Sequence, residues 1–411
     1  MNWNTKTSLK LIFIGLLGIW GLPQAWGLSL ERSPYLQQGS SDAITIVWHT
    51  DEEADGWVHY GTLLEEQTEV SETTSVGTVH SVTLTDLLPG TRYYYSVHST
   101  DTVLVEANEE YYFETAPETG SKAPVRIWVV GDSGTTSWNP KVNVRNAFFE
   151  FAGDHRTNVF LHLGNMSHPN GSADGLQSNF FGVYTNVIRN TVTWPTLGEF
   201  EAQTSDSETQ SGTYFDAFTL PTQGEAGGVA SGTEAYYSFD YGNIHFVVLD
   251  SNQSSREPDG PMFTWLEEDL AATEQDWIIA TWHHSPFTMG SYNSDVEVNH
   301  TEMRERALPI LEAGGVDLVL AGSSHIYERS FLVNGAYDTP TTTEGKILAE
   351  GDGLFSGDGP YVKSTESKAN QGTVYVTAGH GGLEIAKEGD HPLMYFVEDH
   401  LGSCVIDVVG G

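Results

Sequence analysis

The sequence has a single cysteine, Cys404, and few basic residues. One cysteine cannot form an intrachain disulfide, so hydrophobic cores must stabilise the fold, and Cys404 is expected to be a small core residue. Lys and Arg total 18 against 56 Asp and Glu, which gives a formal net charge of -38. A surface this negative repels phosphate backbones and anionic lipids, although it also suits life in saline water. We therefore predict no nucleic-acid partner.

Long apolar runs are absent except near the N-terminus. Lys6 and Lys10 precede an apolar run over residues 11–22, and Ala25-Trp26-Gly27 places small residues where a signal peptidase reads. A run of about a dozen apolar residues is too short for a hydrocarbon core of about 30 Å. The sequence thus predicts a signal peptide over residues 1–27, export to the periplasm or the extracellular space, and no membrane span.

Residues 28–115 contain short alternating apolar runs, such as 43–48 and 81–84, between Gly, Asp and Ser clusters. This alternation is typical of a β-sandwich. Residues 88–97 resemble the fibronectin type III pattern, in which a tyrosine entering a late strand forms a hydrogen bond at the sandwich corner. The composition of residues 116–124, rich in Pro, Gly and Ser, predicts an interdomain linker.

Residues 125–411 alternate strand-like and helical stretches, which predicts an α/β domain. Within it, residues 204–233 are rich in Ser, Gly, Thr and Glu, and we expect a mobile surface insertion there. The chain stops soon after the strand-like residues 404–409, which leaves open whether the C-terminus is complete.

Polar loops follow five of the predicted strands, at the edge of the sheet where open α/β folds bind ligands. Each loop carries carboxylate, amide, hydroxyl or imidazole groups. The loops are Gly131-Asp132-Ser133-Gly134, Gly164-Asn165-Met166-Ser167-His168, Gly198-Glu199-Phe200-Glu201, His283-His284-Ser285-Pro286 and Gly322-Ser323-Ser324-His325.

In this order the five loops resemble the motif set of the metallophosphoesterases, and with the sandwich in front the chain resembles the purple acid phosphatases, in particular their bacterial branch. The resemblance implies a fibronectin III-like all-β sandwich followed by an α/β metallophosphoesterase domain with two facing sheets. It also implies phosphate ester hydrolysis by two metal ions, Fe, Zn or Mn, about 3.5–4 Å apart, which present a bound hydroxide.

Three metal-ligand positions match the family, namely Asp132, His284 and His325. Asn165 stands where the family has the aspartate that bridges the two ions, and a neutral amide oxygen is shared poorly between two cations. His168 stands at the position of the tyrosinate ligand, and Glu199 at that of the ligand asparagine.

Further departures concern the chemistry itself. Phe200 replaces the histidine that assists the leaving group, so acid catalysis worth roughly 10²–10⁴-fold is expected to be missing. Ser323 replaces the first histidine of the fifth motif, while Tyr292 and Asn293 stand at the substrate-binding positions that usually hold His and Asp.

The sequence leaves the metal content open at zero to two ions. The candidate ligands are Asp132, Asn165, His168, Glu199, His284 and His325, and Asp132, His168 and His325 could form a two-histidine, one-carboxylate site for a single ion. The alternative is that these are residual polar groups at strand ends. Glu199 and Glu201 could then be ordinary surface carboxylates, and His162, His245 and His283 packing residues.

Two main functional hypotheses follow. The preferred one is a pseudoenzyme whose cleft binds a phosphate ester or another small anion, because the bridging carboxylate, a ligand histidine and the catalytic histidine are all replaced. The alternative is an active phosphatase with an atypical one- or two-metal site. A third possibility, surface attachment through the sandwich domain, rests on fold analogy alone.

Overall fold

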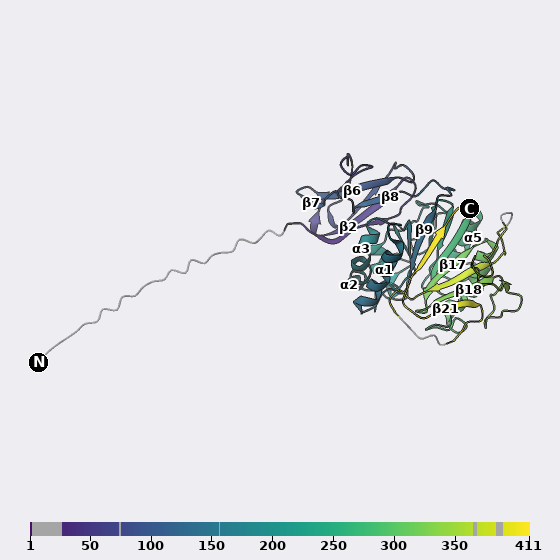
Figure 1. The fold of residues 1–411 in the computed structure, drawn as a ribbon. Helices are drawn as coiled ribbons and strands as arrows, with labels where there is room; N and C mark the ends of the chain where they lie inside the picture. Colours follow the sequence, from purple (N-terminus) through teal and green to yellow (C-terminus); the bar gives the residue numbers. More distant parts are fainter. Residues whose placement is uncertain (2–26, 74, 156, 365–367, 384–388) are drawn as a thin grey trace.

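The computed structural model describes residues 1, 27–73, 75–155, 157–364, 368–383 and 389–411, arranged as a β-sandwich beside a larger α/β domain (Figure 1). The predicted signal peptide, apart from its two terminal residues, lies outside the described residues. Within the described ranges, no helix has the length and apolar character needed to cross a lipid bilayer.

The N-terminal domain is the predicted all-β sandwich. The Tyr93 hydroxyl accepts a hydrogen bond from the Leu88 N–H at 2.9 Å, as the fibronectin-like corner predicts. One sheet has the order β1-β2-β5 and the other β4-β3-β6-β7, with β8 paired to β6. The strands are β1 (Leu30–Gln37), β2 (Ile44–Ala54), β3 (Trp57–Gly61), β4 (Glu69–Glu72), β5 (Gly77–Leu84), β6 (Arg92–Ser99), β7 (Thr102–Val105) and β8 (Tyr112–Glu114).

The second domain contains the two facing sheets that the resemblance implies, which confirms the predicted fold class. Trp194 of one sheet stacks on Phe239 of the other, with ring centroids 3.8 Å apart. The smaller sheet has the order β11-β10-β9-β22 and the larger β14-β15-β16-β17-β20-β18-β19, with β21 beside β18. Their strands are β9 (Val125–Val130), β10 (Val159–His162), β11 (Thr193–Pro195), β14 (Tyr237–Tyr241), β15 (Ile244–Val248), β16 (Trp277–His284), β17 (Leu318–Ser323), β18 (Tyr327–Val333), β19 (Ile347–Ala349), β20 (Thr373–Ala378), β21 (Met394–Glu398) and β22 (Cys404–Val408).

Helices cover the sheets and complete the core. Trp128 of β9 stacks on Phe148 of α1 at 4.0 Å and on Phe160 of β10 at 4.6 Å, so α1 buries an aromatic face against the smaller sheet. The helices are α1 (Trp138–Ala152), α2 (Ala173–Leu176), α3 (Gly182–Ile188), α4 (Thr213–Ala217), α5 (Pro261–Ala272), α6 (Val298–Glu302) and α7 (Leu308–Ala313). A π-helical turn, Gln177–Phe181, joins α2 to α3, and a second, Met303–Ala307, joins α6 to α7. The remaining short elements are the 3-10 turn Glu201–Gln203 and the strands β12 (Ser205–Asp206) and β13 (Ser211–Gly212).

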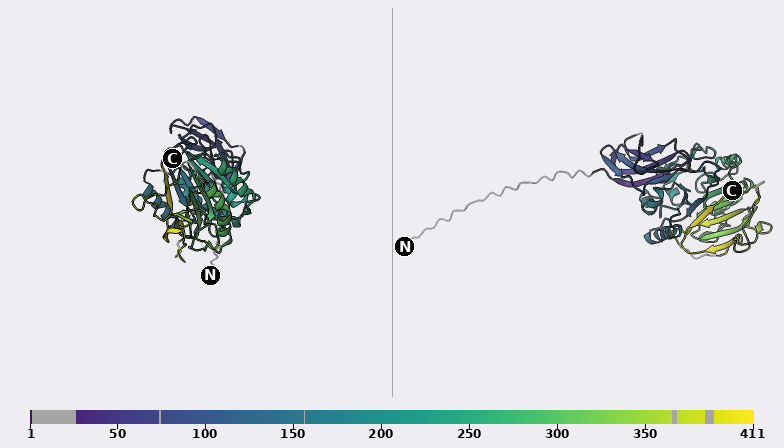
Figure 2. Two further views of the ribbon diagram at one scale, coloured as in Figure 1. Left: turned by 90° about the vertical axis from the view of Figure 1, so that its right-hand side faces the viewer. Right: turned by 45° about the horizontal axis from the view of Figure 1, so that its top comes forward.

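The predicted linker is held by both domains. The Ala116 N–H donates to Ser40 O at 3.0 Å, and the Gly120 N–H donates to Gly242 O at 2.7 Å. In the right-hand view of Figure 2, the purple strands of the sandwich lie beside the teal helices of the second domain. Because backbone hydrogen bonds hold both halves of this segment, it fixes the two domains rather than tethering them loosely.

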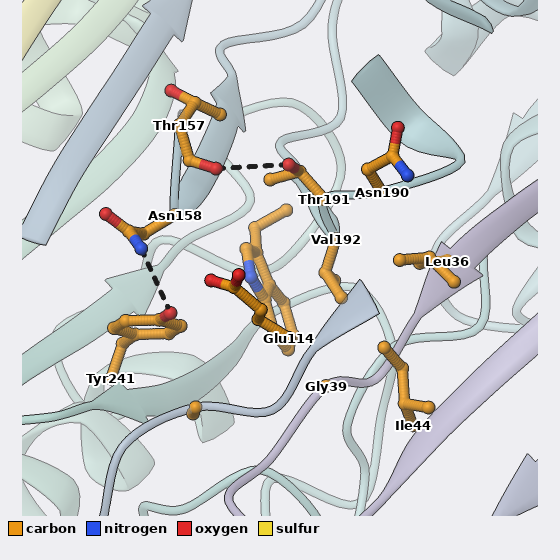
Figure 3. Close-up of a pocket in the computed structure, with 12 residues that line it drawn as sticks. Leu36, Gly39, Ile44, Glu114, Thr157, Asn158, Asn190, Thr191, Val192 and Tyr241 are labelled. Carbon is orange, nitrogen blue, oxygen red and sulfur yellow. Dashed lines mark hydrogen bonds between the residues drawn. The ribbon is translucent and has the colours of Figure 1, made fainter. Parts of the chain in front are cut away.

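A pocket opens at the seam between the domains (Figure 3). Leu36 and Ile44 from the sandwich face Val192 and Tyr241 from the second domain, and Asn158 donates to the Tyr241 hydroxyl at 3.4 Å. None of the candidate site residues lines this pocket, so it is part of the domain interface.

The expectation of a mobile insertion over residues 204–233 is wrong. Tyr214, Phe215, Phe218 and Leu220 are all buried in the core of the second domain. The polar composition of the segment concealed these apolar side chains. The Tyr214 hydroxyl also donates to Pro195 O at 3.0 Å, which ties the segment to the end of β11.

The domain seam yields a first prediction. The buried Tyr35 hydroxyl donates to Ala217 O across the seam at 2.9 Å. Tyr35→Phe leaves that carbonyl unpaired, so we expect the free energy of unfolding to fall by about 1–3 kcal/mol in urea titrations. Tyr60→Phe, on β3 of the same domain, is the comparison, and equal losses in the two variants would contradict a special role for the seam contact.

Candidate functional site

The five predicted loops converge at one edge of the two sheets, where close backbone packing requires glycine. A Cβ on Gly198 would lie 2.0 Å from Asn165 N, and one on Gly164 would lie 2.7 Å from the Gly198 Cα. The second and third loops therefore touch through their glycines. A Cβ on Gly322, in the fifth loop, would lie 2.3 Å from Leu163 O, so the larger sheet approaches the smaller one equally closely at this edge.

Several candidate residues adopt the left-handed backbone conformation that non-glycine residues avoid. The φ angles are 49° at Asp132, 57° at Asn165, 54° at His325 and 138° at Ser324. Such conformations cost free energy and persist where the surrounding structure enforces them, often at functional sites. The loops thus retain the backbone shape of a ligand site.

Asp132 is a buried carboxylate without a hydrogen-bond partner. Its side chain is 1% exposed, and neither oxygen bonds to any described residue. Burial raises the pKa of Asp132 well above its usual value; the nearby Asn165 side chain offsets this only in part, and the charges of Glu199 and Glu201 add to the rise. A buried carboxylate of this kind is stabilised by a bound cation, so Asp132 fits a metal ion.

Asn165 is already bonded within the site. Its Oδ1 accepts the Phe200 N–H at 3.0 Å, and its own N–H donates to Glu201 Oε2 at 2.9 Å. The amide oxygen at the bridging position is therefore directed to the backbone of the third loop.

Glu201 has a structural role that the sequence did not reveal. It is fully buried, whereas a surface carboxylate was one expectation. Besides the Asn165 N–H, its carboxylate accepts the Ser167 N–H at 2.7 Å and the Gly198 N–H at 3.2 Å. These bonds from two loops hold the second and third motifs together.

Glu199 and His284 form a hydrogen bond across the two sheets. Glu199 Oε1 lies 3.1 Å from His284 Nε2, and the Tyr292 hydroxyl donates to Glu199 Oε2 at 3.2 Å. The hydrogen bond with His284 lowers the pKa of Glu199 to about 2. Asn293 instead caps its own turn, accepting the Asp295 N–H at 2.9 Å. Of the two predicted substrate-binding residues, only Tyr292 contacts a candidate ligand here.

His284 has partners that the sequence analysis missed. Its Nδ1 lies 2.8 Å from Ser251 Oγ, and its Nε2 lies 3.3 Å from Asn299 Nδ2. Arg256 in turn donates to Asn299 Oδ1 at 2.9 Å. Ser251 follows a strand in the same way as the five motif loops, which is the signal that could have indicated it.

His168 lies against the ring of Phe200. The two rings meet edge to face with centroids 5.0 Å apart, and the buried Nδ1 of His168 has no partner among the described residues. Burial, aided by the Lys141 charge, lowers the pKa of His168. Lys141, a buried lysine on α1 that donates to Thr135 O at 2.9 Å, was not anticipated from the sequence.

His325 and Ser323 complete the fifth loop. His325 Nδ1 lies 3.1 Å from Ser291 Oγ, and burial lowers the pKa of this histidine. Ser323 is buried, and its Oγ bonds to none of the described residues. A hydroxyl thus stands where the resemblance implies an imidazole ligand.

The donor atoms do not converge as a preformed three-ligand cluster. Over the described ranges, only the exposed group Glu398, Asp399 and His400 brings three His, Cys, Asp or Glu donor atoms within 4.8 Å of one another. Among the six candidate ligands, the buried atoms without a partner belong to Asp132 and His168, whereas Glu199 and His284 are paired. The residues therefore fit one ion near Asp132 and do not fit a second.

Comparison with known proteins agrees with this architecture. Residues 32–115 match the model of the purple acid phosphatase N-terminal domain, and residues 125–327 match that of the calcineurin-like phosphoesterases. The chain is 29% identical over 306 residues to purple acid phosphatase 23 of Arabidopsis thaliana, covering 67% of this chain and 62% of that protein. It is 25% identical over 401 residues to an uncharacterized protein of Mycobacterium tuberculosis, covering 88% and 70%.

Solved structures show the same fold. The purple acid phosphatase PPD1 of yellow lupin superposes with a TM-score of 0.67 at 17% identity, covering 92% of this chain and 70% of that one. PhoD superposes with a TM-score of 0.61 at 14% identity, covering 92% and 84%.

The fold and its loops define a calcineurin-like phosphoesterase, a class that hydrolyses phosphate esters with bound metal ions. Within that class, the N-terminal domain and the relatives show that the chain belongs to the purple acid phosphatase family. The alignments span 62% and 66% of the lengths of two Arabidopsis relatives.

Proposed function

We propose that this chain keeps the phosphoesterase fold as a phosphate-ester-binding protein in which hydrolysis of phosphate monoesters is impaired or lost. One observation carries the proposal. The Phe200 N–H donates to Asn165 Oδ1 while its ring packs on His168. The resemblance assigns position 200 to the leaving-group acid and position 165 to the bridging ligand, so a phenyl group replaces the acid and the bridging oxygen is already bonded to backbone.

The charge of the cleft determines how it can hold a phosphate ester. Asp132, Glu199 and Glu201 place three carboxylates near one another, and such a cleft repels an anion. Asp132, His168 and His325 are the residues that would hold one Fe, Zn or Mn ion. When bound, such an ion supplies the positive charge that attracts phosphate oxygens and lowers the pKa of coordinated water. Tyr292, from the loop after β16, presents its ring beside this cleft.

Phosphate binding should therefore depend on metal. We expect isothermal titration calorimetry to detect binding of inorganic phosphate in the presence of Mn(II) and none after chelation. Asp132→Asn should weaken the Mn(II)-dependent binding by about 10–100-fold, because it removes a ligand of the ion. Asp174→Asn, at an exposed position, is the matched control. Equal phosphate affinity with and without metal would contradict the proposal.

A second candidate is an active phosphoesterase that uses a single ion. It is favoured by the two unpaired oxygens of Asp132 and the unpaired Nδ1 of His168. Turnover of p-nitrophenyl phosphate by the wild-type protein separates the two functions. The first proposal expects turnover at or close to that of the metal-containing buffer, and the second expects clear turnover that saturates at one ion per chain.

We also propose that the protein is exported, on the basis of Lys6, Lys10 and the apolar run over residues 11–22. N-terminal sequencing of protein secreted by a bacterial host should then begin at Leu28. A mature protein that still begins at Met1 would contradict export through this segment.

A further inference from the structure

The Glu199–His284 pair links the two sheets at the edge that carries the site. Glu199 follows β11 of the smaller sheet, and His284 ends β16 of the larger one. Their side chains meet at 3.1 Å, and Tyr292, in the loop after β16, adds a hydrogen bond to the second Glu199 oxygen at 3.2 Å. Both oxygens of the carboxylate are therefore used in joining the loop after β11 to the end of β16 and the loop that follows it.

The other candidate ligands beside the pair are already bonded or are replaced by a weaker ligand. His284 Nδ1 lies 2.8 Å from Ser251 Oγ, so both nitrogens of this imidazole have partners. Asn165 Oδ1 accepts the Phe200 N–H at 3.0 Å. Ser323, in register with His284 across β16 and β17, offers a hydroxyl, which is a weak ligand for a transition metal. A cation that binds here would have to displace these hydrogen bonds. Because Ser323 stands in place of a histidine, the cation would also gain one imidazole ligand fewer in return.

We propose that the Glu199–His284 pair replaces the second metal ion as the cross-link between the two sheets, so that the cleft holds at most one ion. In a two-metal phosphoesterase, ions ligated from both sheets make this connection. Here a carboxylate and an imidazole make it directly, and the Tyr292 hydroxyl adds a second hydrogen bond from the loop after β16. The inference rests on the proposed function because both concern the same cleft. Its own claim is about the number of ions that the cleft holds.

The test counts tightly bound ions. All proteins carry His400→Asn, which dismantles the exposed group Glu398, Asp399 and His400 so that it adds nothing to the count. They are loaded with Zn(II), passed through metal-free buffer and analysed by elemental mass spectrometry. We expect at most one ion per chain in this background and two after Asn165→Asp, Glu199→Asn and Ser323→His are combined. Glu118→Asn, in the exposed linker, is the matched control and should leave the count unchanged.

Two ions per chain in the background protein would overturn the inference. So would a triple variant that retains the circular dichroism spectrum of the background yet gains no ion. If the triple variant does not fold, Glu199→Gln decides: we expect its melting temperature to fall by about 2–4 °C and Zn(II) not to restore it. An unchanged melting temperature, or full rescue by Zn(II), would count against the cross-link.

The outcomes for ion number and for function are distinguishable. Turnover by a protein with one ion would contradict the proposed loss of hydrolysis and leave the replaced second ion standing. Two ions without turnover would contradict the replacement and leave the loss of hydrolysis standing.

Discussion

Restoring four family residues is expected to raise the hydrolysis of p-nitrophenyl phosphate by at least about 10²-fold over wild type. The combined variant carries Asn165→Asp, Glu199→Asn, Phe200→His and Ser323→His. Asn165→Asp and Ser323→His would restore ligands for two ions, and Glu199→Asn would release His284 from its hydrogen bond to Glu199. Glu201 and the packed glycines of the second and third loops already hold the backbone in place, so the scaffold should accept these side chains.

The histidine at position 200 can be separated from the metal ligands. The same variant with Phe200 retained should bind two ions yet turn over about 10²–10⁴-fold more slowly, because it lacks the group that protonates the leaving oxygen. Steady-state kinetics at saturating Zn(II) provide both rates. Equal rates with Phe and His at position 200 would contradict the assignment of that position.

His245→Gln is expected to cost roughly 3–5 kcal/mol of unfolding free energy, the largest stability effect we foresee. His245 is 1% exposed and lies 2.8 Å from both Asp240 and Asp269, the latter fully buried. Glutamine cannot carry the positive charge, so the variant leaves buried carboxylates without a counter-charge. His155→Gln, at an exposed position, is the control and should change stability by less than about 0.5 kcal/mol in urea titrations.

The same triad predicts how stability depends on pH. Burial lowers the pKa of His245, but its hydrogen bonds and ion pairs with Asp240 and Asp269 outweigh burial and raise the pKa to about 9, from 6.5 in the unfolded chain. The stabilisation is therefore complete below pH 6.5 and is lost as the pH rises through 9. The stability gap between wild type and His245→Gln should shrink over that interval. If the stability gap stays constant from pH 6 to pH 10 within the precision of the urea titration, His245 is not charged in the folded protein.

The fold could be predicted from the sequence because its signals are local. Alternating apolar residues marked the sandwich strands, and polar loops after apolar runs marked the edge where Asp132, Asn165, Glu199, His284 and His325 gather. The prediction of a mobile insertion over residues 204–233 was wrong because the composition of this segment is typical of turns. Its few aromatic residues pack against partners that lie far away in the sequence. Composition cannot show which apolar side chains find a core.

The bonding within the site could not be predicted, since it depends on distances across two sheets. The sequence placed Glu199 and His284 at ligand positions, but 85 residues separate them and no motif indicates that they pair. Glu201 resembled a surface residue in so acidic a chain, although it binds three backbone N–H groups. Lys141, on α1, matched no motif at all.

The most direct test of the account is the anomalous diffraction of crystals of the unaltered protein soaked in Zn(II). We predict at most one anomalous peak in the cleft, beside Asp132, with Glu199 and His284 still paired. Two peaks, one of them between Glu199 and His284, would contradict the account.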